Sequence, residues 1–102
     1  MNLFRIFALV LLNVVGYSGF LRNVAVALGN SNNPTTIPYL KVALAHQEHL
    51  VRSHTAWALG NIGGTKAKPI LTKASYSETD PSVRQEIQWA LTAIAKKPTN
   101  KV

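Results

Sequence analysis

Arginines recur along the chain at a regular interval. Arg22, Arg52 and Arg84 each follow an apolar residue, near the start of a stretch that could form a helix. A row of guanidinium groups is suited to phosphate oxygens, because each group can donate two parallel hydrogen bonds. The alternative is structural, with each arginine bonding a carbonyl or a carboxylate of a neighbouring repeat. For a residue that is built into a repeat, we favour the structural alternative.

Lysines add to the positive charge. Lys66 and Lys68 fall on or beside one expected helix, and Lys41 lies on the equivalent helix before it. The chain has 11 Lys and Arg residues against 4 Asp and Glu residues, for a formal net charge of +7. This balance favours an anionic partner, whether nucleic acid, a membrane surface or an acidic protein. With Asn23 nearby, these cations indicate a surface that could follow a phosphate backbone.

The residue types needed for metal binding or catalysis do not form a recognisable pattern. The turn expected before Leu50 keeps His46, His49 and His54 from sharing one face, so we expect no metal site. The absence of cysteine excludes thiolate zinc sites, cysteine nucleophiles and cysteine-bound iron–sulfur clusters. No carboxylates pair within one expected helix, and no glycine-rich loop precedes a helix. We therefore assign no catalytic residue, and we expect His54 to face the surface or an RNA.

An internal repeat organises these residues. The Ala-Leu pairs that begin at Ala27, Ala58 and Ala90 lie 31 and then 32 positions apart, and Trp57 matches Trp89. A fixed period near thirty residues is typical of a helical solenoid. Tryptophans that recur in register on a helix indicate packing between repeats, with base stacking as the alternative.

Each period divides into two helices. The second helices should begin near Phe20, Leu50 and Ser82, and the first helices should cover about residues 36–45 and 66–76. Several short motifs predict where the helices begin and end. Asp80-Pro81 is a start signal, Gly29-Asn30 and Gly60-Asn61 should end helices in the left-handed conformation, and Gly63-Gly64 should form the turn. No segment alternates with period two, so the sequence predicts an all-α solenoid of about two and a half helix pairs.

The N-terminal segment permits more than one interpretation. Residues 1–18 contain an apolar run from Ile6 to Val15 that is short for a membrane span. We favour a capping helix on the first repeat, and a secretory signal or a membrane anchor through residues 3–15 is the alternative. The expected organisation is this helix, a repeat domain over residues 19–95 and a basic tail over residues 96–102.

Three stretches carry a resemblance to a known family. The period, the Ala-Leu-Gly endings and the Val-Arg starts resemble HEAT-like repeats of the short type that is also found in phycobilin lyases. GFLRNVAVALGNSNNP (19–34), HLVRSHTAWALGNIGG (49–64) and SETDPSVRQEIQWAL (77–91) are similar, in order, to the C-terminal repeats of tRNA epoxyqueuosine reductase. The resemblance extends from Gly19 to about Ala95.

The resemblance implies a function in RNA binding. That family is cytoplasmic and uses cobalamin and two [4Fe–4S] clusters to reduce epoxyqueuosine in tRNA, and its repeats help to hold the tRNA. This chain lacks the catalytic half and the cluster cysteines, so we expect no cofactor and no independent reductase activity in it, although the family that it resembles consists of oxidoreductases. The expected RNA contacts are Arg22, Asn23, Arg52 and His54, with Lys66 and Lys68 beside them across the turn.

Two functions from different classes follow from the sequence. The first is a non-catalytic, cytoplasmic tRNA-binding repeat module whose cations converge on one concave surface. The second is a protein-interaction scaffold without a nucleic-acid role, which residues 3–15 could tether to a membrane or which could be exported if residues 1–18 are a signal. A chaperone similar to the phycobilin lyases shares the repeats but has little specific support.

Overall fold

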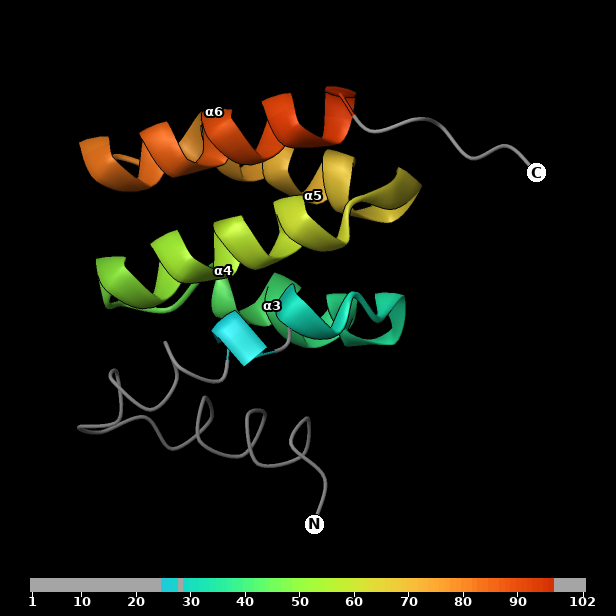
Figure 1. Ribbon diagram of the computed structural model, residues 1–102. Helices are drawn as coiled ribbons and strands as arrows, with labels where there is room; N and C mark the ends of the chain where they lie inside the picture. Colours follow the sequence, from blue (N-terminus) through green and yellow to red (C-terminus); the bar gives the residue numbers. More distant parts are fainter. Residues whose placement is uncertain (1–24, 28, 97–102) are drawn as a thin grey trace, which may run out of the picture.

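The computed structural model describes residues 25–27 and 29–96, and over these residues it contains helices and no strand (Figure 1). The all-α prediction is therefore confirmed for this part of the chain. The apolar segment 1–18, the expected contacts Arg22 and Asn23, and the tail beyond Lys96 lie outside the described residues. Residues 25–27 and 29–31 are helical and belong to the first expected second helix.

The helix boundaries agree closely with the sequence patterns. From Pro34 to Lys96 the chain forms a short 3-10 helix and then four α-helices: η1 Pro34–Thr36, α3 Ile37–Ala43, α4 His49–Ile62, α5 Gly64–Ser77 and α6 Pro81–Lys96. Helix α3 is shorter than predicted, because Thr36 belongs to the 3-10 helix and the chain turns after Ala43.

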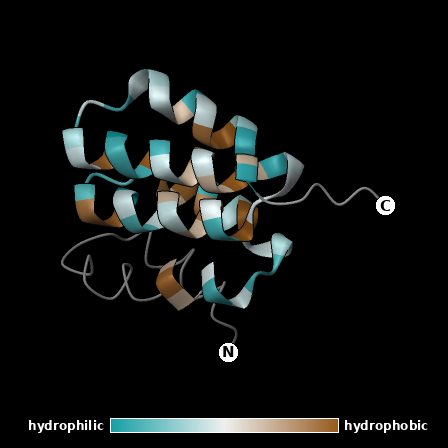
Figure 2. Cartoon of the chain, turned by 45° about the horizontal axis from the view of Figure 1, so that its top comes forward, coloured by the Kyte–Doolittle hydropathy of each residue, from teal (hydrophilic) through white to brown (hydrophobic). Residues whose placement is uncertain are grey.

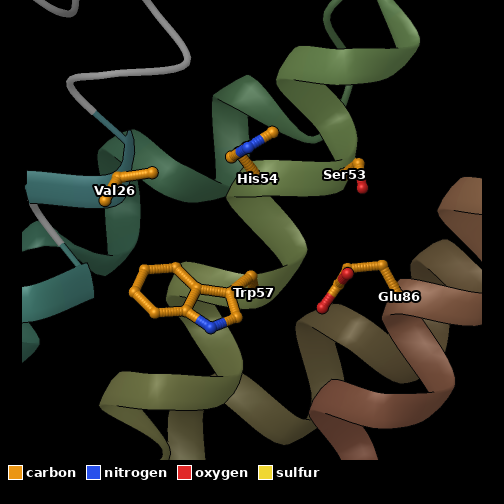
Figure 3. Close-up of a pocket in the computed structure, with 5 residues that line it drawn as sticks. All are labelled: Val26, Ser53, His54, Trp57 and Glu86. Atoms are coloured by element: carbon orange, nitrogen blue, oxygen red, sulfur yellow. The ribbon is translucent and has the colours of Figure 1, made fainter.

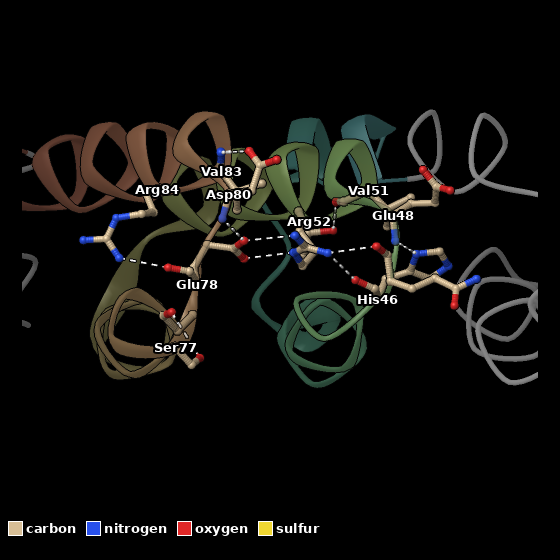
Figure 4. A network of polar contacts seen from close by, with 12 residues as sticks. His46, Glu48, Val51, Arg52, Ser77, Glu78, Asp80, Val83 and Arg84 are labelled. Carbon is tan, nitrogen blue, oxygen red and sulfur yellow. Dashed lines mark hydrogen bonds and ion pairs between the residues drawn. The ribbon is translucent and has the colours of Figure 1, made fainter.

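The helices form two layers around one apolar core. Helices α4 and α6 run side by side and make the most extensive contact between helices (Figure 1). Helices α3 and α5 lie in the second layer, below α4 and α6 in the view of Figure 4. Hydrophobic residues gather where the helices face one another (Figure 2). The fully buried side chains come from all four helices and include Leu40, Val51, Leu59, Leu71, Val83 and Ile87.

The start of α6 confirms the predicted capping motif. The Oδ1 atom of Asp80 accepts hydrogen bonds from the backbone N–H groups of Ser82 and Val83, at 2.9 and 3.1 Å. Pro81 is the first residue of the helix, where a missing N–H costs little. Hydrogen bonds from the Ser82 hydroxyl and from the backbone hold the pKa of the Asp80 carboxyl below its usual value.

The prediction that Gly29 and Gly60 end helices was wrong. Both are helical, and among the described glycines the positive φ angles belong to Gly63 at 69° and Gly64 at 87°. A Cβ atom on Gly60 would lie 2.6 Å from the Cβ and 2.7 Å from the Cα of Ala90. Glycine at position 60 therefore lets the backbones of α4 and α6 approach closely. The turn is made at Gly63, which follows α4 directly, whereas Gly64 already begins α5.

Candidate functional site

Arg52 is held by contacts within the protein (Figure 4). Its Nε and Nη2 atoms donate to the two carboxylate oxygens of Glu78, both at 2.9 Å. Its Nη1 atom donates to the backbone carbonyls of His46 and Gln47, at 2.9 and 3.0 Å. Arg52 thus ties α4 to the segment before it and to the connection between α5 and α6.

Glu78 is nearly buried, with 8% of its side chain exposed against 17% for Arg52. Burial alone would raise the pKa of its carboxyl, but hydrogen bonds from Arg52 and from the backbone N–H of Asp80 lower the pKa below its ordinary value. Arg84 also bonds backbone, because its Nη1 atom donates to the carbonyls of Ser75 and Glu78. These contacts match the structural alternative for both arginines, and the Arg52 guanidinium is occupied by them.

The remaining expected contacts do not lie together. His54 is half-buried on α4, with its Nδ1 atom 2.9 Å from the carbonyl oxygen of Leu50. Lys66 and Lys68 are exposed on the first turns of α5, beyond the far end of α4. Ile62, the last residue of α4, lies eight positions after His54, which is about 12 Å along a helix. The expectation that the lysines lie beside Arg52 and His54 was wrong, because a whole section of α4 separates them.

The described lysines also do not converge on the layer of second helices. Lys41 lies on α3, and Lys66, Lys68 and Lys73 lie on α5, all exposed. Only Lys96, at the end of α6, belongs to the other layer among the described lysines. Most described lysines therefore lie in the layer of α3 and α5, whereas Arg52 and Arg84 lie on α4 and α6, and the convergence of lysines and arginines on one concave surface stays a prediction.

A hollow on the layer of α4 and α6 brings together residues that the sequence left apart. One side of it is lined by Val26, Ser53, His54, Trp57 and Glu86 (Figure 3). A second part, of about 320 Å³, shares Trp57 and Glu86 and adds a further set of residues: Gly60, Asn61, Trp89, Ala90 and Ala93. Burial raises the pKa of the Glu86 carboxyl, and the nearby His54 offsets part of this rise.

The two tryptophans differ in their surroundings. Trp57 is half-buried against the core, and its ring fills the space beside Gly29, where an added Cβ would lie 2.6 Å from the Trp57 Cζ3 atom. Trp89 is 61% exposed, so the prediction of packing between repeats does not describe it. At Gly60 the three nearest atoms all belong to Ala90, which corresponds to Ala58 beside Gly29, and none of them belongs to Trp89.

Sequence reasoning missed Glu86 as a member of this hollow. Glu86 and Trp89 are three residues apart, a spacing that places two side chains on one helix face. That spacing was the available signal. The sequence could not show that Trp57 and His54, from the preceding repeat, complete the same hollow.

His46 is a buried residue with an unusual environment. Its Nδ1 atom accepts a hydrogen bond from the backbone N–H of Glu48 at 3.0 Å, so the proton of the neutral ring is on Nε2. The Nε2 atom has no hydrogen-bond partner among the described residues. Burial lowers the pKa of His46, with the Glu48 charge opposing this effect and the Arg52 charge adding to it.

The described residues do not fit the cofactors that the sequence resemblance implies. The chain has no cysteine to bind an iron–sulfur cluster. Within residues 25–27 and 29–96, no group of three or more His, Asp or Glu side chains could hold a metal ion. None of the helices in this part of the chain is long and apolar enough to cross a membrane.

Comparisons with known proteins identify relatives of part of the chain. It is 47% identical over 53 residues to an epoxyqueuosine reductase of Pseudomonas aeruginosa, a match that covers 49% of this chain and 14% of that protein. It is 36% identical over 67 residues to an epoxyqueuosine reductase of Staphylococcus aureus, covering 65% of this chain and 17% of that protein. A Geobacillus stearothermophilus protein named "Uncharacterized protein in gldA 3'region" is 35% identical over 68 residues, covering 65% and 31%.

The chain spans less than a third of the length of each of these relatives. No solved structure matches the chain at a significant level. The family model for HEAT repeats matches residues 20–92, which include all four described α-helices except the end of α6. With paired helices, a repeat of 31 to 32 residues and this match over most of its length, the chain belongs to the HEAT repeat family.

Proposed function

We propose that this chain is a non-catalytic RNA-binding repeat module of the cytoplasm and that tRNA is its ligand. The observation that carries the proposal is the similarity of the repeats to epoxyqueuosine reductases, joined to a net charge of +7. A chain with this excess of cations attracts a polyanion at long range, and the attraction falls with salt. The whole reductase activity is not part of the proposal.

The exposed lysines of α5 are the proposed phosphate contacts. Lys66 and Lys68 stand on either side of the buried Ala67, about 200° apart around the helix. Lys73 lies seven residues after Lys66, and so on nearly the same face, about 10 Å further along the helix. The three side chains therefore reach different phosphates. His54 is a separate proposed contact on the other layer, and Arg22 and Asn23 remain proposals outside the described residues.

A filter-binding titration with total tRNA over a range of salt concentrations tests the proposal. We expect the affinity to fall linearly on a log–log scale, and the double variant Lys66→Ala/Lys68→Ala to reduce the slope by roughly 1 to 2. The variant Lys66→Arg/Lys68→Arg keeps both charges and is the matched control. Absence of binding at low salt, or binding that salt does not weaken, would overturn the proposal.

A protein-interaction scaffold is the second candidate, and the exposure of Trp89 supports it. Exposed aromatic residues are enriched at protein interfaces, and helical repeats provide extended binding surfaces. If the chain is such a scaffold, the variant Trp89→Ala should lose a protein partner in affinity purification, and neither this variant nor the wild type should bind tRNA at low salt. Cell fractionation of a tagged chain tests whether residues 3–15 tether it to a membrane and whether residues 1–18 act as an export signal. A wholly soluble, uncleaved product would contradict both.

A further inference from the structure

The hollow between α4 and α6 has the features of a site for one flat, hydrogen-bonding ring. Both tryptophans of the chain line it, at positions that correspond in successive repeats. Trp89 offers a largely exposed ring, and Trp57 forms part of the wall. With about 320 Å³, its larger part is near the lower end of the range for ligand pockets, roughly 300 Å³, and so suits a single ring system.

Glu86 supplies the polar group of the hollow. It lines both parts of the hollow, and Figure 3 shows its carboxylate directed toward the Trp57 ring. Within the described part of the chain, the Glu86 carboxylate accepts no hydrogen bond from another residue, in contrast to the carboxylates of Glu78 and Asp80. A half-buried carboxylate of this kind has two oxygens that a ligand with two adjacent donors can satisfy.

Among the four RNA bases, guanine alone presents two adjacent donors on its Watson–Crick edge. Its N1–H and exocyclic N2–H groups point the same way, whereas adenine and cytosine place an acceptor beside their amino group and uracil places carbonyls on both sides of its N–H. Unpaired bases in RNA are commonly stacked on aromatic side chains and read on this edge. We propose that the hollow binds an unpaired guanine base of the RNA, stacked on Trp89, with Glu86 accepting its N1–H and N2–H groups.

This inference rests on the proposed RNA-binding function and assigns a specific contact to it. A basic peptide could also place an arginine between an indole ring and a carboxylate. The net charge of +7 disfavours that partner, because a basic peptide is repelled at long range while RNA is attracted. The two kinds of contact are thereby separated by function: lysines on α5 bind phosphates, and the hollow on α4 and α6 reads a base.

Intrinsic fluorescence tests the inference directly, since all tryptophan emission comes from this hollow. The probes are single-stranded pentanucleotides with four uridines and one central base, which is guanine, adenine, cytosine, uracil or hypoxanthine. Hypoxanthine keeps the N1–H group of guanine and lacks the amino group. We expect the guanine probe to bind roughly tenfold more tightly than the others, with hypoxanthine between guanine and adenine.

Two variants and one control make the test specific. Glu86→Gln should remove the preference for guanine while the fold, followed by circular dichroism, stays intact. Trp89→Ala should weaken binding of every pentanucleotide by roughly 5- to 150-fold, with the remaining Trp57 as the reporter. Glu48→Gln makes the same charge change at an exposed carboxylate that caps no helix N–H, and it should leave the preference unchanged.

Three results would overturn the inference: equal affinity for all five probes, an unchanged guanine preference in Glu86→Gln, or quenching by an arginine-rich peptide that exceeds quenching by RNA. Salt-dependent tRNA binding without any guanine preference would refute this inference alone. Absence of tRNA binding would refute the proposed function, while the pentanucleotides would still report whether the hollow selects guanine.

Discussion

The ion pair between Arg52 and Glu78 decides whether the recurring arginines serve the fold or a ligand. We expect Arg52→Met to destabilise the protein strongly, because it leaves the Glu78 carboxylate, 8% exposed, without its cation and removes two hydrogen bonds to backbone carbonyls. Removing one partner of a buried ion pair costs about 3–5 kcal/mol. Since 17% of the Arg52 side chain is exposed to water, the lower end of about 3 kcal/mol is expected here.

Urea unfolding followed by circular dichroism measures this loss. Domains of this size have an unfolding free energy of about 5–15 kcal/mol, so a loss of 3 kcal/mol is a large fraction of the total. The double variant Arg52→Met/Glu78→Gln completes a thermodynamic cycle with the two single variants. If the two side chains act on each other, the coupling free energy should be about 2 kcal/mol.

The same ion pair predicts a dependence on pH. The pKa of Glu78 is lower in the folded protein than its ordinary value of 4.5, so its stabilising effect is complete above that value. The effect is lost as the pH falls through the folded-state pKa, and the difference in unfolding free energy between the wild type and Glu78→Gln should shrink in parallel.

A stable Arg52→Met variant with weakened tRNA binding would refute the structural interpretation of Arg52.

Three further predictions concern the core, the helix contact and the buried histidine. Leu71→Ala should lower the unfolding free energy by about 2–5 kcal/mol, because Leu71 is fully buried. Leu50→Ala is the control and should lower it much less, because Leu50 is 42% exposed. Equal losses of the two variants in urea unfolding would contradict the described core. Gly60→Ala should lower the unfolding free energy by about 1–3 kcal/mol, because the added methyl group overpacks against Ala90. The higher helix propensity of alanine offsets up to about 1 kcal/mol of this loss. A net increase in the unfolding free energy would refute the close contact between α4 and α6. The pKa of His46 is lowered in the folded state, so stability should decline as the pH falls below the ordinary value of 6.5, and His46→Gln should have a flatter melting-temperature profile between pH 7.5 and 5.

The sequence was sufficient for the helix pairs because their signals are local or periodic. Asp80-Pro81 identified the start of α6 to within one residue, since a capping carboxylate and an N-terminal proline act on the adjacent backbone. The Ala-Leu period identified the buried stripes of α4 and α6, where Ala58, Leu59 and Ala90 are buried, whereas Ala27 of the first pair is exposed. The fold class follows from such signals without any knowledge of distant contacts.

The errors concern residues whose role depends on another repeat. A glycine after Ala-Leu fits either a left-handed helix end or a close contact between helices, and the contact partner of Gly60 is 30 positions away. The predicted position of Lys66 and Lys68 was wrong for a similar reason. They follow α4 closely in sequence, but they lie near its end, and Arg52 and His54 lie near its start. Glu86 lies beside Trp57 and His54 of α4, and no local sequence pattern indicates which residues of another helix will surround it.

The packing that holds α6 against α4 also shapes the proposed base site. Arg52 fixes the beginning of α4 to the connection that precedes α6, and Gly60 brings the two backbones together further along. Trp89 and Glu86 stand on α6, and Trp57 stands on α4 between those two contacts. Because closely packed backbones leave little room for adjustment, the spacing between the α4 and α6 positions that carry the two tryptophans is set before a ligand arrives. A site of this kind loses little conformational entropy on binding, so a change such as Gly60→Ala should weaken the guanine preference as well as the fold.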